Sequence, residues 1–322
     1  MPEKMPAHRP ISLRTPRCRA RAFLVRVFAA VALLAGAARG FAASGDWAVE
    51  FYNHYRATPN LTYKVIGKNE LKLDIYQRSD VTGPVPTLFF VHGGGWVHQS
   101  KSDVLGNILP WLEWGWTVVN VDYRLAGEAS APAAVDDCRC ALRWVAANAE
   151  KYHFDLKRLV ISGASAGGEL ALVTGMAPDN AGLDQDGPGG PRPDAAAFVN
   201  YSGILDVTDL VQGPHLTTWA VTWIPNGPGQ LEMARKVSPL TYVRVGLPPI
   251  LTIHGDADDA VPYQQAVRFH EALTRAGVSN QLVTIAGGKH GGYTIAENVQ
   301  LYAAIRAFLT AHQLIPPEFS TK

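Results

Sequence analysis

The sequence predicts an α/β fold in which a mostly parallel sheet is covered by helices on both faces. Two continuous apolar runs, PTLFFV at 86–91 and WTVVNV at 116–121, are typical of strands buried on both faces. Segments with helical character, such as 133–149 and 261–276, lie between such runs. Strands and helices therefore alternate with short turns, which is the order that produces a parallel sheet.

The strands begin near the start of the predicted domain. Strand character appears from Leu61, and Leu71, Leu73 and Ile75 then alternate with polar residues, as in a strand with one wet face. Pro132 favours a helix that begins directly after it. The later elements are expected, in chain order, at 86–91 (strand), 116–121 (strand), 133–149 (helix), 158–162 (strand), 169–176 (helix), 195–201 (strand), 250–254 (strand), 261–276 (helix), 280–285 (strand) and 296–312 (helix).

The domain organisation is expected to be simple. The chain has 322 residues, of which 47% are hydrophobic, and this is enough for one sizeable core. We expect a single catalytic domain over 43–322, with an insertion at about 206–247 that breaks the alternation of strands and helices. The insertion could be a lid over a site or an ordinary surface loop. The Gly- and Pro-rich stretch 178–193 reads as a surface loop.

The first 42 residues have a different pattern. Arginines crowd 9–26, an uninterrupted apolar run follows at 27–38, and small residues come next at Gly40 and Ala42. This order is typical of a secretory signal that is cleaved, so we expect residues 1–42 to be removed and the mature protein to be secreted or periplasmic. No stable membrane insertion is expected after cleavage, because the apolar run is short for a membrane span. The alternatives are an uncleaved anchor and a true start at Met5.

Charge and cysteine content exclude several classes of protein. The net charge is +1 with 18% charged residues, so there is no basic field for nucleic acid. Cys138 and Cys140 stand two residues apart in an expected helix, roughly 200° apart around its axis. A disulfide between them would be strained, and they make a poor metal site, so we expect ordinary helix residues, at least one of them buried, and no metal. The oligomeric state stays open.

The segment Gly163-Ala164-Ser165-Ala166-Gly167 has the Gly-x-Ser-x-Gly pattern between an expected strand and an expected helix. That context is the one in which a tight turn exposes a serine oxygen at the end of a sheet. The flanking glycines allow the strand and the helix to pack closely. We therefore expect Ser165 to be a nucleophile, whereas a Gly/Ser/Ala turn without chemistry is the alternative.

The loop His92-Gly93-Gly94-Gly95-Trp96 follows the buried strand at 86–91 directly. Glycines expose backbone N–H groups, and such donors stabilise the oxyanion of a tetrahedral intermediate. We expect Gly94 and Gly95 to be two donors and Ala166 to be the third. His92 is expected to shape the loop. A phosphate-binding loop is the rival interpretation, but no Gly-Lys-Ser/Thr ending follows.

An acid and a base are expected on loops that follow two later strands. His290 lies among glycines in GKHGG at 288–292, and HGDADDAVP at 254–262 contains three competing aspartates, Asp256, Asp258 and Asp259. Serine needs a neutral imidazole to accept its proton, and a carboxylate orients that imidazole. The chain order of serine, acid and histidine suits this type of fold.

Five segments carry a resemblance to a known family: HGGGW at 92–96, VDYRLA at 121–126, GASAGG at 163–168, HGDADDAVP at 254–262 and GKHGG at 288–292. Together they resemble the hormone-sensitive-lipase-like branch of the α/β hydrolases, and within it the bacterial feruloyl/acetylxylan esterases. The resemblance implies an α/β-hydrolase fold. It places the triad acid on Asp258 and supports Gly94, Gly95 and Ala166 as the oxyanion hole. Many members of the branch have Asp where this chain has Ala164.

The expected activity is hydrolysis of carboxylic esters through a Ser165-Asp258-His290 triad, with no cofactor. The resemblance and the export signal favour short-chain or plant-polysaccharide acyl esters, acetyl or feruloyl, so the partner would be a small-molecule or polysaccharide-linked ester. Trp96, Trp219 and Trp223 could line an acyl pocket or belong to the core. The alternatives are a formamidase, a peptidase, and a non-catalytic binding module of the same fold.

Overall fold

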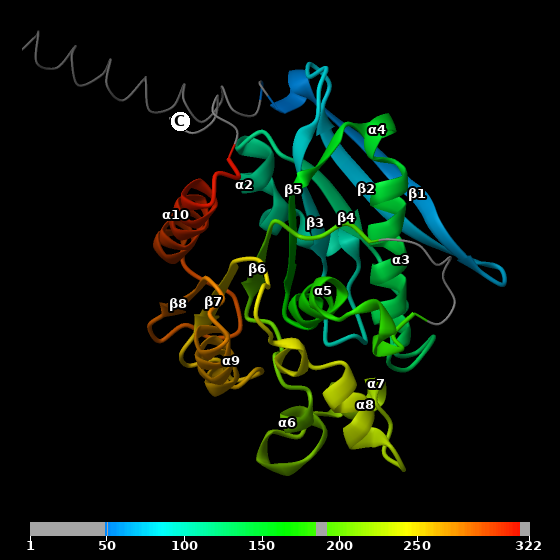
Figure 1. The fold of residues 1–322 in the computed structure, drawn as a ribbon, viewed down its shortest axis with the longest axis vertical. Coiled ribbons are helices and arrows are strands. Elements are labelled where there is room, and N and C mark those ends of the chain that lie inside the picture. Colours follow the sequence, from blue (N-terminus) through cyan, green and yellow to red (C-terminus); the bar gives the residue numbers. More distant parts are fainter. Residues whose placement is uncertain (1–48, 50, 185–191, 316–322) are drawn as a thin grey trace, which may run out of the picture. The chain divides into compact units, whose positions relative to one another are not determined.

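An eight-stranded sheet organises the computed structural model, which describes residues 49, 51–184 and 192–315. The sheet and its helices lie in the compact unit that spans His54–Lys322 (Figure 1). The predicted signal segment 1–42 and part of the predicted loop 178–193 lie outside the described residues. The strands are β1 Tyr55–Ile66, β2 Asn69–Arg78, β3 Val85–Val91, β4 Thr117–Val121, β5 Phe154–Ala164, β6 Ala197–Tyr201, β7 Ile250–Gly255 and β8 Asn280–Ile285.

The strand order is β1-β2-β4-β3-β5-β6-β7-β8. β1 pairs with β2 and β2 with β4 in antiparallel fashion, and all the other pairs are parallel. Every residue of β3, β4, β6 and β7 is buried, so both faces of the sheet are covered. The predicted α/β architecture with a mostly parallel sheet is confirmed.

The helices that cover the sheet come mainly from the crossover connections. α3 packs against α5, and α5 contacts β3, β5 and β6, whereas α9 lies on β7 and β8 (Figure 1). Tyr302 of α10 donates a hydrogen bond to the Gly106 carbonyl of α2, which joins these two helices. The α-helices are α2 Leu105–Glu113, α3 Ala133–Ala147, α4 Ala149–Tyr152, α5 Ala166–Met176, α6 Thr208–Val211, α7 Thr218–Trp223, α8 Gln230–Lys236, α9 Tyr263–Arg275 and α10 Ile295–Ala311. Short 3-10 turns occur at Lys101–Val104, Asp179–Ala181, Gly213–His215 and Pro239–Tyr242.

One row of apolar side chains runs across the centre of the sheet. Phe89 is in register with Val119 on one side and with Ile161 on the other, and the row continues through Phe198 to Ile250. All five side chains are buried. Residues in register on neighbouring strands share a face, so these residues build one continuous layer of the core.

Two helix bounds and one missed helix differ from the sequence prediction for identifiable reasons. The helix after the serine begins at Ala166 instead of Glu169, because the two glycines that follow Ala166 are helical and buried. Helix α2 was not predicted: Pro110 stands inside it, although Ile108, Trp111 and Leu112 bury one face. The helix expected at 133–149 ends at Ala147, and a short separate helix follows.

The predicted insertion, 206–247, lies between β6 and β7 and contains α6, α7 and α8.

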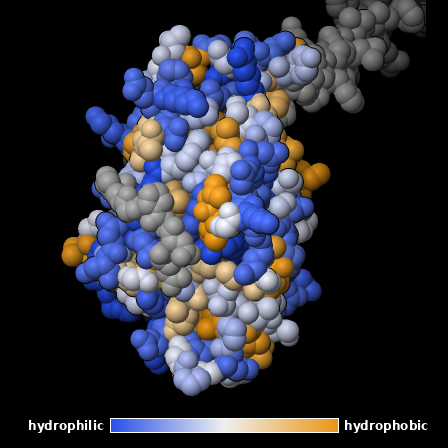
Figure 2. Space-filling view, turned by 90° about the vertical axis from the view of Figure 1, so that its right-hand side faces the viewer, coloured by the Kyte–Doolittle hydropathy of each residue, from blue (hydrophilic) through white to orange (hydrophobic). Residues whose placement is uncertain are grey.

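Cys138 and Cys140 are both buried and free, as expected of helix residues. No helix among the described residues has the length and apolar character needed to span a membrane. On the face that Figure 2 shows, hydrophobic side chains are scattered among hydrophilic ones, as is usual for a protein surface.

Candidate active site

Ser165 occupies a sharp turn between β5 and α5. Its backbone has φ 55° and ψ −124°, which is an unfavourable region for a residue with a side chain and costs about 1–3 kcal/mol. The Ser165 N–H donates to the Tyr201 carbonyl at 2.8 Å, which helps to hold the turn. A Cβ at Gly167 would come within 2.2 Å of the carbonyl oxygens of Val91 and His92, so only glycine fits there. The predicted turn is therefore formed, and it carries the serine at the carboxyl edge of the sheet.

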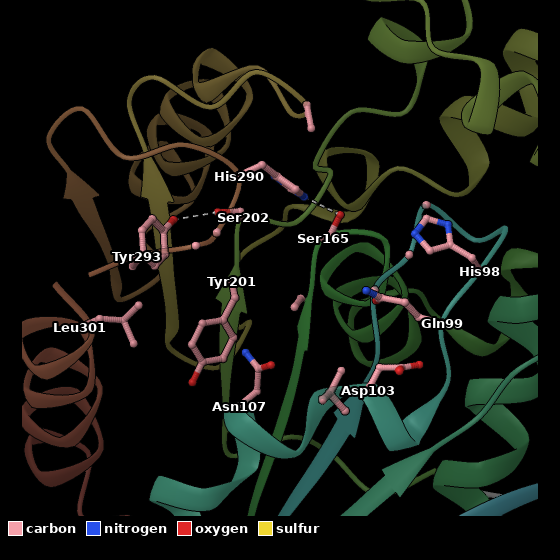
Figure 3. Close-up of a pocket in the computed structure, with 18 of the residues that line it drawn as sticks. His98, Gln99, Asp103, Asn107, Ser165, Tyr201, Ser202, His290, Tyr293 and Leu301 are labelled. Carbon is pink, nitrogen blue, oxygen red and sulfur yellow. Dashed lines mark hydrogen bonds between the residues drawn. The ribbon is translucent and has the colours of Figure 1, made fainter. Parts of the chain in front are cut away.

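The structure brings together the three residues that the sequence had placed on separate loops. The Ser165 hydroxyl lies 2.8 Å from Nε2 of His290 (Figure 3). Nδ1 of His290 lies 2.7 Å from Oδ2 of Asp258. Ser165 follows β5, Asp258 follows β7 and His290 follows β8, and these strands run parallel, so their carboxyl ends share one edge of the sheet. Because a carboxylate only accepts, His290 donates from Nδ1, and its Nε2 is free to accept the serine proton.

The three candidate aspartates have different partners. Asp258 accepts from His290, whereas Asp256 accepts from the Gly287 N–H at 2.6 Å. Asp259 is exposed and lies 3.7 Å from the Lys289 ammonium. Asp258 is thus the aspartate for which a hydrogen bond to His290 is found.

Four N–H groups surround the Asp258 carboxylate. Its Oδ1 accepts from the backbone N–H groups of Ala260 and Val261 at 2.9 and 2.8 Å, and its Oδ2 faces His290 and His254. Burial alone would raise the pKa of Asp258, but the hydrogen bonds from His254, His290 and Val261 hold it well below its usual range. The carboxylate is therefore ionised and tightly oriented.

His254 is a site residue that sequence reasoning missed. It is fully buried, and its Nε2 lies 3.1 Å from Asp258 Oδ2 and 3.1 Å from the Val261 carbonyl oxygen. Both neighbours are acceptors, so His254 donates from Nε2. Its Nδ1 has no hydrogen-bond partner among the described residues. The signal in the sequence was its place as a polar residue at the end of the buried run ILTIH.

The oxyanion loop, residues 92–96, borders the serine. Gly94 and Gly95 have φ angles of 93° and 58°, and no hydrogen bond among the described residues uses their backbone N–H groups. A Cβ on Gly94 would fall 2.0 Å from the His98 carbonyl oxygen, so this position requires glycine. Ala166 is the first residue of α5, and the N–H groups of a first helical turn have no acceptor within the helix. All three predicted donors are thus available near Ser165.

His92 shapes this loop and does not reach the serine's base. Its Nδ1 lies 3.0 Å from the Gly93 carbonyl, and its ring stacks on Tyr123 with the ring centres 4.2 Å apart. The Tyr123 hydroxyl donates to the same Gly93 carbonyl at 2.9 Å. Burial lowers the pKa of His92, which favours the neutral ring.

The interpretation of three tryptophans as pocket residues is wrong for two of them. Only Trp219 lines the cavity at Ser165, whereas Trp96 and Trp223 are completely buried. The rings of Trp96 and Trp223 stack with centres 4.0 Å apart and an angle of 11° between them. Large flat rings that stack on each other bury most of their area, which leaves no face for a substrate.

Glu169 is completely buried behind the elbow. Its Oε2 accepts from Nε1 of Trp96 at 2.9 Å, and its Oε1 has no partner among the described residues. Burial raises the pKa of Glu169 well above its usual range, and the Trp96 hydrogen bond offsets this only in part. Burial therefore disfavours the charged form of this acid.

The cavity at Ser165 has a volume of about 560 Å³ (Figure 3). Its wall includes Ser165, His290, the glycines of the oxyanion loop and Trp219, and none of the described residues that line it is a Lys or an Arg. The side chains of Gln99, Asn107 and Asn298 contribute amide groups. Among the described residues, no group of three or more His, Cys, Asp or Glu is placed to hold a metal ion.

Comparison with known proteins decides the family. The BD-FAE family pattern matches residues 73–273, which is more than half of the chain. The chain belongs to the BD-FAE family. This agrees with the resemblance to bacterial feruloyl/acetylxylan esterases in the sequence.

Two relatives in Mycobacterium tuberculosis are named as ester hydrolases. The chain is 32% identical to Esterase LipC of Mycobacterium tuberculosis over 229 residues, which is 68% of this chain. It is 30% identical to the probable carboxylic ester hydrolase LipM of the same organism over 248 residues, or 74% of this chain. The matched regions span 56% of the length of each of these relatives.

A solved structure shares the fold. The butyrate-bound esterase Est2 of Thermogutta terrifontis superposes with a TM-score of 0.69 and 28% identity, covering 81% of this chain and 96% of Est2. The same enzyme phosphorylated by paraoxon gives a TM-score of 0.67 at 28% identity, over the same shares of the two chains. The predicted α/β-hydrolase fold of the BD-FAE protein is thereby confirmed.

Proposed function

We propose that this BD-FAE protein is a serine carboxylic-ester hydrolase that works through an acyl-enzyme. The observation that carries the proposal is the continuous hydrogen-bonded series from Ser165 through His290 to Asp258, at 2.8 and 2.7 Å. It lies beside the backbone N–H groups of Gly94 and Gly95, for which no partner is found in the described part of the chain. The names of LipC, LipM and Est2 as esterases support the reaction class.

The chemistry proceeds in two halves. Ser165 Oγ attacks the ester carbonyl while His290 Nε2 takes its proton, and Asp258 stabilises the imidazolium that forms. The carbonyl oxygen becomes an oxyanion held by the N–H groups of Gly94, Gly95 and Ala166. His290 gives its proton to the leaving alcohol, and the acyl group stays on Ser165. Water then attacks this ester in the same way, and the acid is released.

The substrates we propose are short-chain acyl esters and acetyl or feruloyl esters on plant polysaccharides. The family match supports the second group, and the butyrate-bound and propionate-bound structures of Est2 support small acyl groups. The cavity of about 560 Å³ exceeds what an acetyl group needs, and its amide side chains suit hydroxyl-bearing substrates. A panel of p-nitrophenyl acetate, butyrate and octanoate with methyl ferulate would rank these possibilities by kcat/KM.

The activity is tested with the Ser165→Ala variant. We expect at least about a 10³-fold loss of kcat on p-nitrophenyl butyrate, because the triad acts as a unit. A fluorophosphonate probe should label the native protein and leave the variant unlabelled. Retained hydrolysis or labelling in a folded Ser165→Ala protein contradicts the proposal, and an unlabelled native protein favours a non-catalytic binding module.

We also propose that the protein is exported, as the basic and apolar pattern of residues 1–42 indicates. Expression of the full chain in a bacterial host, with mass spectrometry of the extracytoplasmic product, tests this. A mature N-terminus near residue 43 is expected, and a full-length protein that stays inside the cell would contradict it.

A further inference from the structure

Trp96 ends the oxyanion loop in an unusual backbone conformation. Gly94, Gly95 and Trp96 have consecutive φ angles of 93°, 58° and 60°. Glycine adopts such angles freely, but a residue with a bulky side chain rarely does. A conformation of this kind persists only where surrounding contacts hold it in place. The contacts of Trp96 are therefore contacts that hold the loop.

Trp96 is held by three different parts of the fold. Its Nε1 donates to Oε2 of Glu169 on α5 at 2.9 Å, and its ring stacks on Trp223 of α7, with centres 4.0 Å apart. Its carbonyl accepts from the Ala126 N–H at 2.8 Å. Trp96, Glu169 and Trp223 are completely buried, so no water competes for these contacts. We name these three residues the tryptophan clamp.

The clamp connects the two halves of the proposed catalytic centre. Glu169 lies on the helix that begins directly after Ser165, whereas Trp96 directly follows Gly95. The hydrogen bond between their side chains therefore links the nucleophile's helix to the loop that carries two oxyanion donors. A shift of the Trp96 ring would be transmitted to the adjacent loop backbone. The N–H groups of Gly94 and Gly95 in that loop must both point at the position of the oxyanion.

We propose that Glu169 and Trp223 are positioning residues that act through Trp96 on the oxyanion loop. The inference rests on the proposed function, because it assigns these residues a role in stabilising the oxyanion. It also assigns α7 of the insertion a fixed place over the loop. A second ring of α7 supports this, since Trp219 packs so closely on Gly95 that a Cβ there would come within 3.2 Å of the indole. The backbone carbonyl of Trp223 further accepts from the Ala131 N–H at 2.9 Å.

The first experiment compares Glu169→Met with Glu169→Gln. Met has a similar size but cannot accept the indole N–H bond, whereas Gln retains a carbonyl oxygen for it. For Glu169→Met we expect kcat on p-nitrophenyl butyrate to fall about tenfold with KM nearly unchanged, which is the pattern for an interaction made only in the transition state. Glu169→Gln should restore kcat to within about twofold of the native value.

A transition-state analogue gives a readout that simple loss of packing does not move. A trifluoromethyl ketone forms a tetrahedral oxyanion adduct with an active serine, and its Ki should rise about tenfold in Glu169→Met. Trp223→Leu, which removes the stacked ring, should also raise this Ki. Trp116→Phe is the matched control, because Trp116 is a completely buried tryptophan whose Nε1 has no partner among the described residues. It should lower the melting temperature without changing the Ki.

The results separate three outcomes. If Glu169→Met and Trp223→Leu melt at lower temperature but keep the native kcat and Ki, the clamp is core packing only and the inference is overturned. If Glu169→Met does not fold, Trp96→Phe is measured in the same way, because it removes the N–H and retains a ring. The proposed function itself fails if Ser165→Ala stays active, or if the native protein is neither active nor labelled by the fluorophosphonate probe, so the two failures are distinguishable.

Discussion

The most heavily hydrogen-bonded charge in the site is the carboxylate of Asp258, and His254 is the part of its environment that spacing in the sequence does not reveal. The His254 N–H shares Oδ2 of Asp258 with His290, at 3.1 and 2.7 Å respectively. It thereby limits the rotation of the carboxylate while leaving His290 the shorter contact. His254 is separated from the Ser165 oxygen by three hydrogen bonds, and it can in this way influence the orientation of the His290 ring.

Replacing His254 by Phe should therefore weaken catalysis. The ring shape is retained, but the donor to Asp258 is lost, and hydrogen bonds to charged groups contribute about 1.5–3 kcal/mol. We expect kcat/KM on p-nitrophenyl butyrate to fall about tenfold or more across pH 6–9. His254→Gln retains an N–H donor and should recover part of the loss. Native activity in a folded His254→Phe protein would show that the two backbone donors suffice.

Glu169 gives a second prediction at this scale, on stability. Burial raises the pKa of Glu169, while the unfolded chain ionises near its ordinary value of about 4.3. Above that pH the unfolded state binds fewer protons than the folded state, so this group makes stability fall as pH rises. The titratable groups that interact electrostatically with Glu169 are Tyr123, Cys138 and Tyr242. None of these three is a cation, so none of them stabilises the charged carboxylate.

Glu169→Gln lacks this titration. The melting temperature of the variant minus that of the native protein should therefore increase as pH rises from 4 towards neutrality. This difference should be smallest at pH 4. Differential scanning fluorimetry over this range measures it, with the exposed Glu232→Gln as control. A difference that does not change with pH would mean that Glu169 is charged when folded.

At the scale of elements, the elbow depends on close approach of backbone to backbone. Gly167 of α5 lies against the end of β3, where a Cβ would fall 2.2 Å from two carbonyl oxygens. Backbone cannot yield as a side-chain tip can, so Gly167→Ala must push α5 away from the sheet. We expect a destabilisation of about 3 kcal/mol or more, or failure to fold, measured by urea unfolding. Gly106→Ala in α2 has no atom within 4 Å of the added methyl group and should be neutral or slightly stabilising.

The elements also show what can be read from sequence. Ser165, His290 and the group of aspartates were predicted because each follows an apolar strand, and parallel strands bring their carboxyl ends to one edge. Trp96 was misjudged because the direction of a loop side chain has no period to reveal it, and Trp223 was misjudged because the short helix α7 has too few residues to show one. Helix α2 was missed because Pro110 and Gly106 read as loop residues, although burial of one face stabilises the helix.

At the scale of the whole molecule, partly buried ion pairs tie the crossover segments together. Arg139 of α3 is completely buried and donates to both oxygens of Asp184, at 2.9 and 2.6 Å, and Arg143 lies 2.7 Å from the same carboxylate. Burial raises the pKa of Asp184, but the hydrogen bonds from these two arginines lower it more strongly, to well below the usual range. The pair joins α3 to the chain that follows α5.

This arrangement predicts how stability depends on acid. An aspartate with a depressed pKa stabilises the fold fully above its unfolded pKa of about 3.9, and this contribution is lost as pH falls through the folded pKa. Asp184→Asn keeps one acceptor but loses the charge, so we expect about 1.5–3 kcal/mol lower stability at pH 7 by urea unfolding. The gap between native protein and variant should then narrow steadily below pH 4. A gap that is equally large at pH 3 and pH 7 would show that shape, and not charge, is what Asp184 contributes.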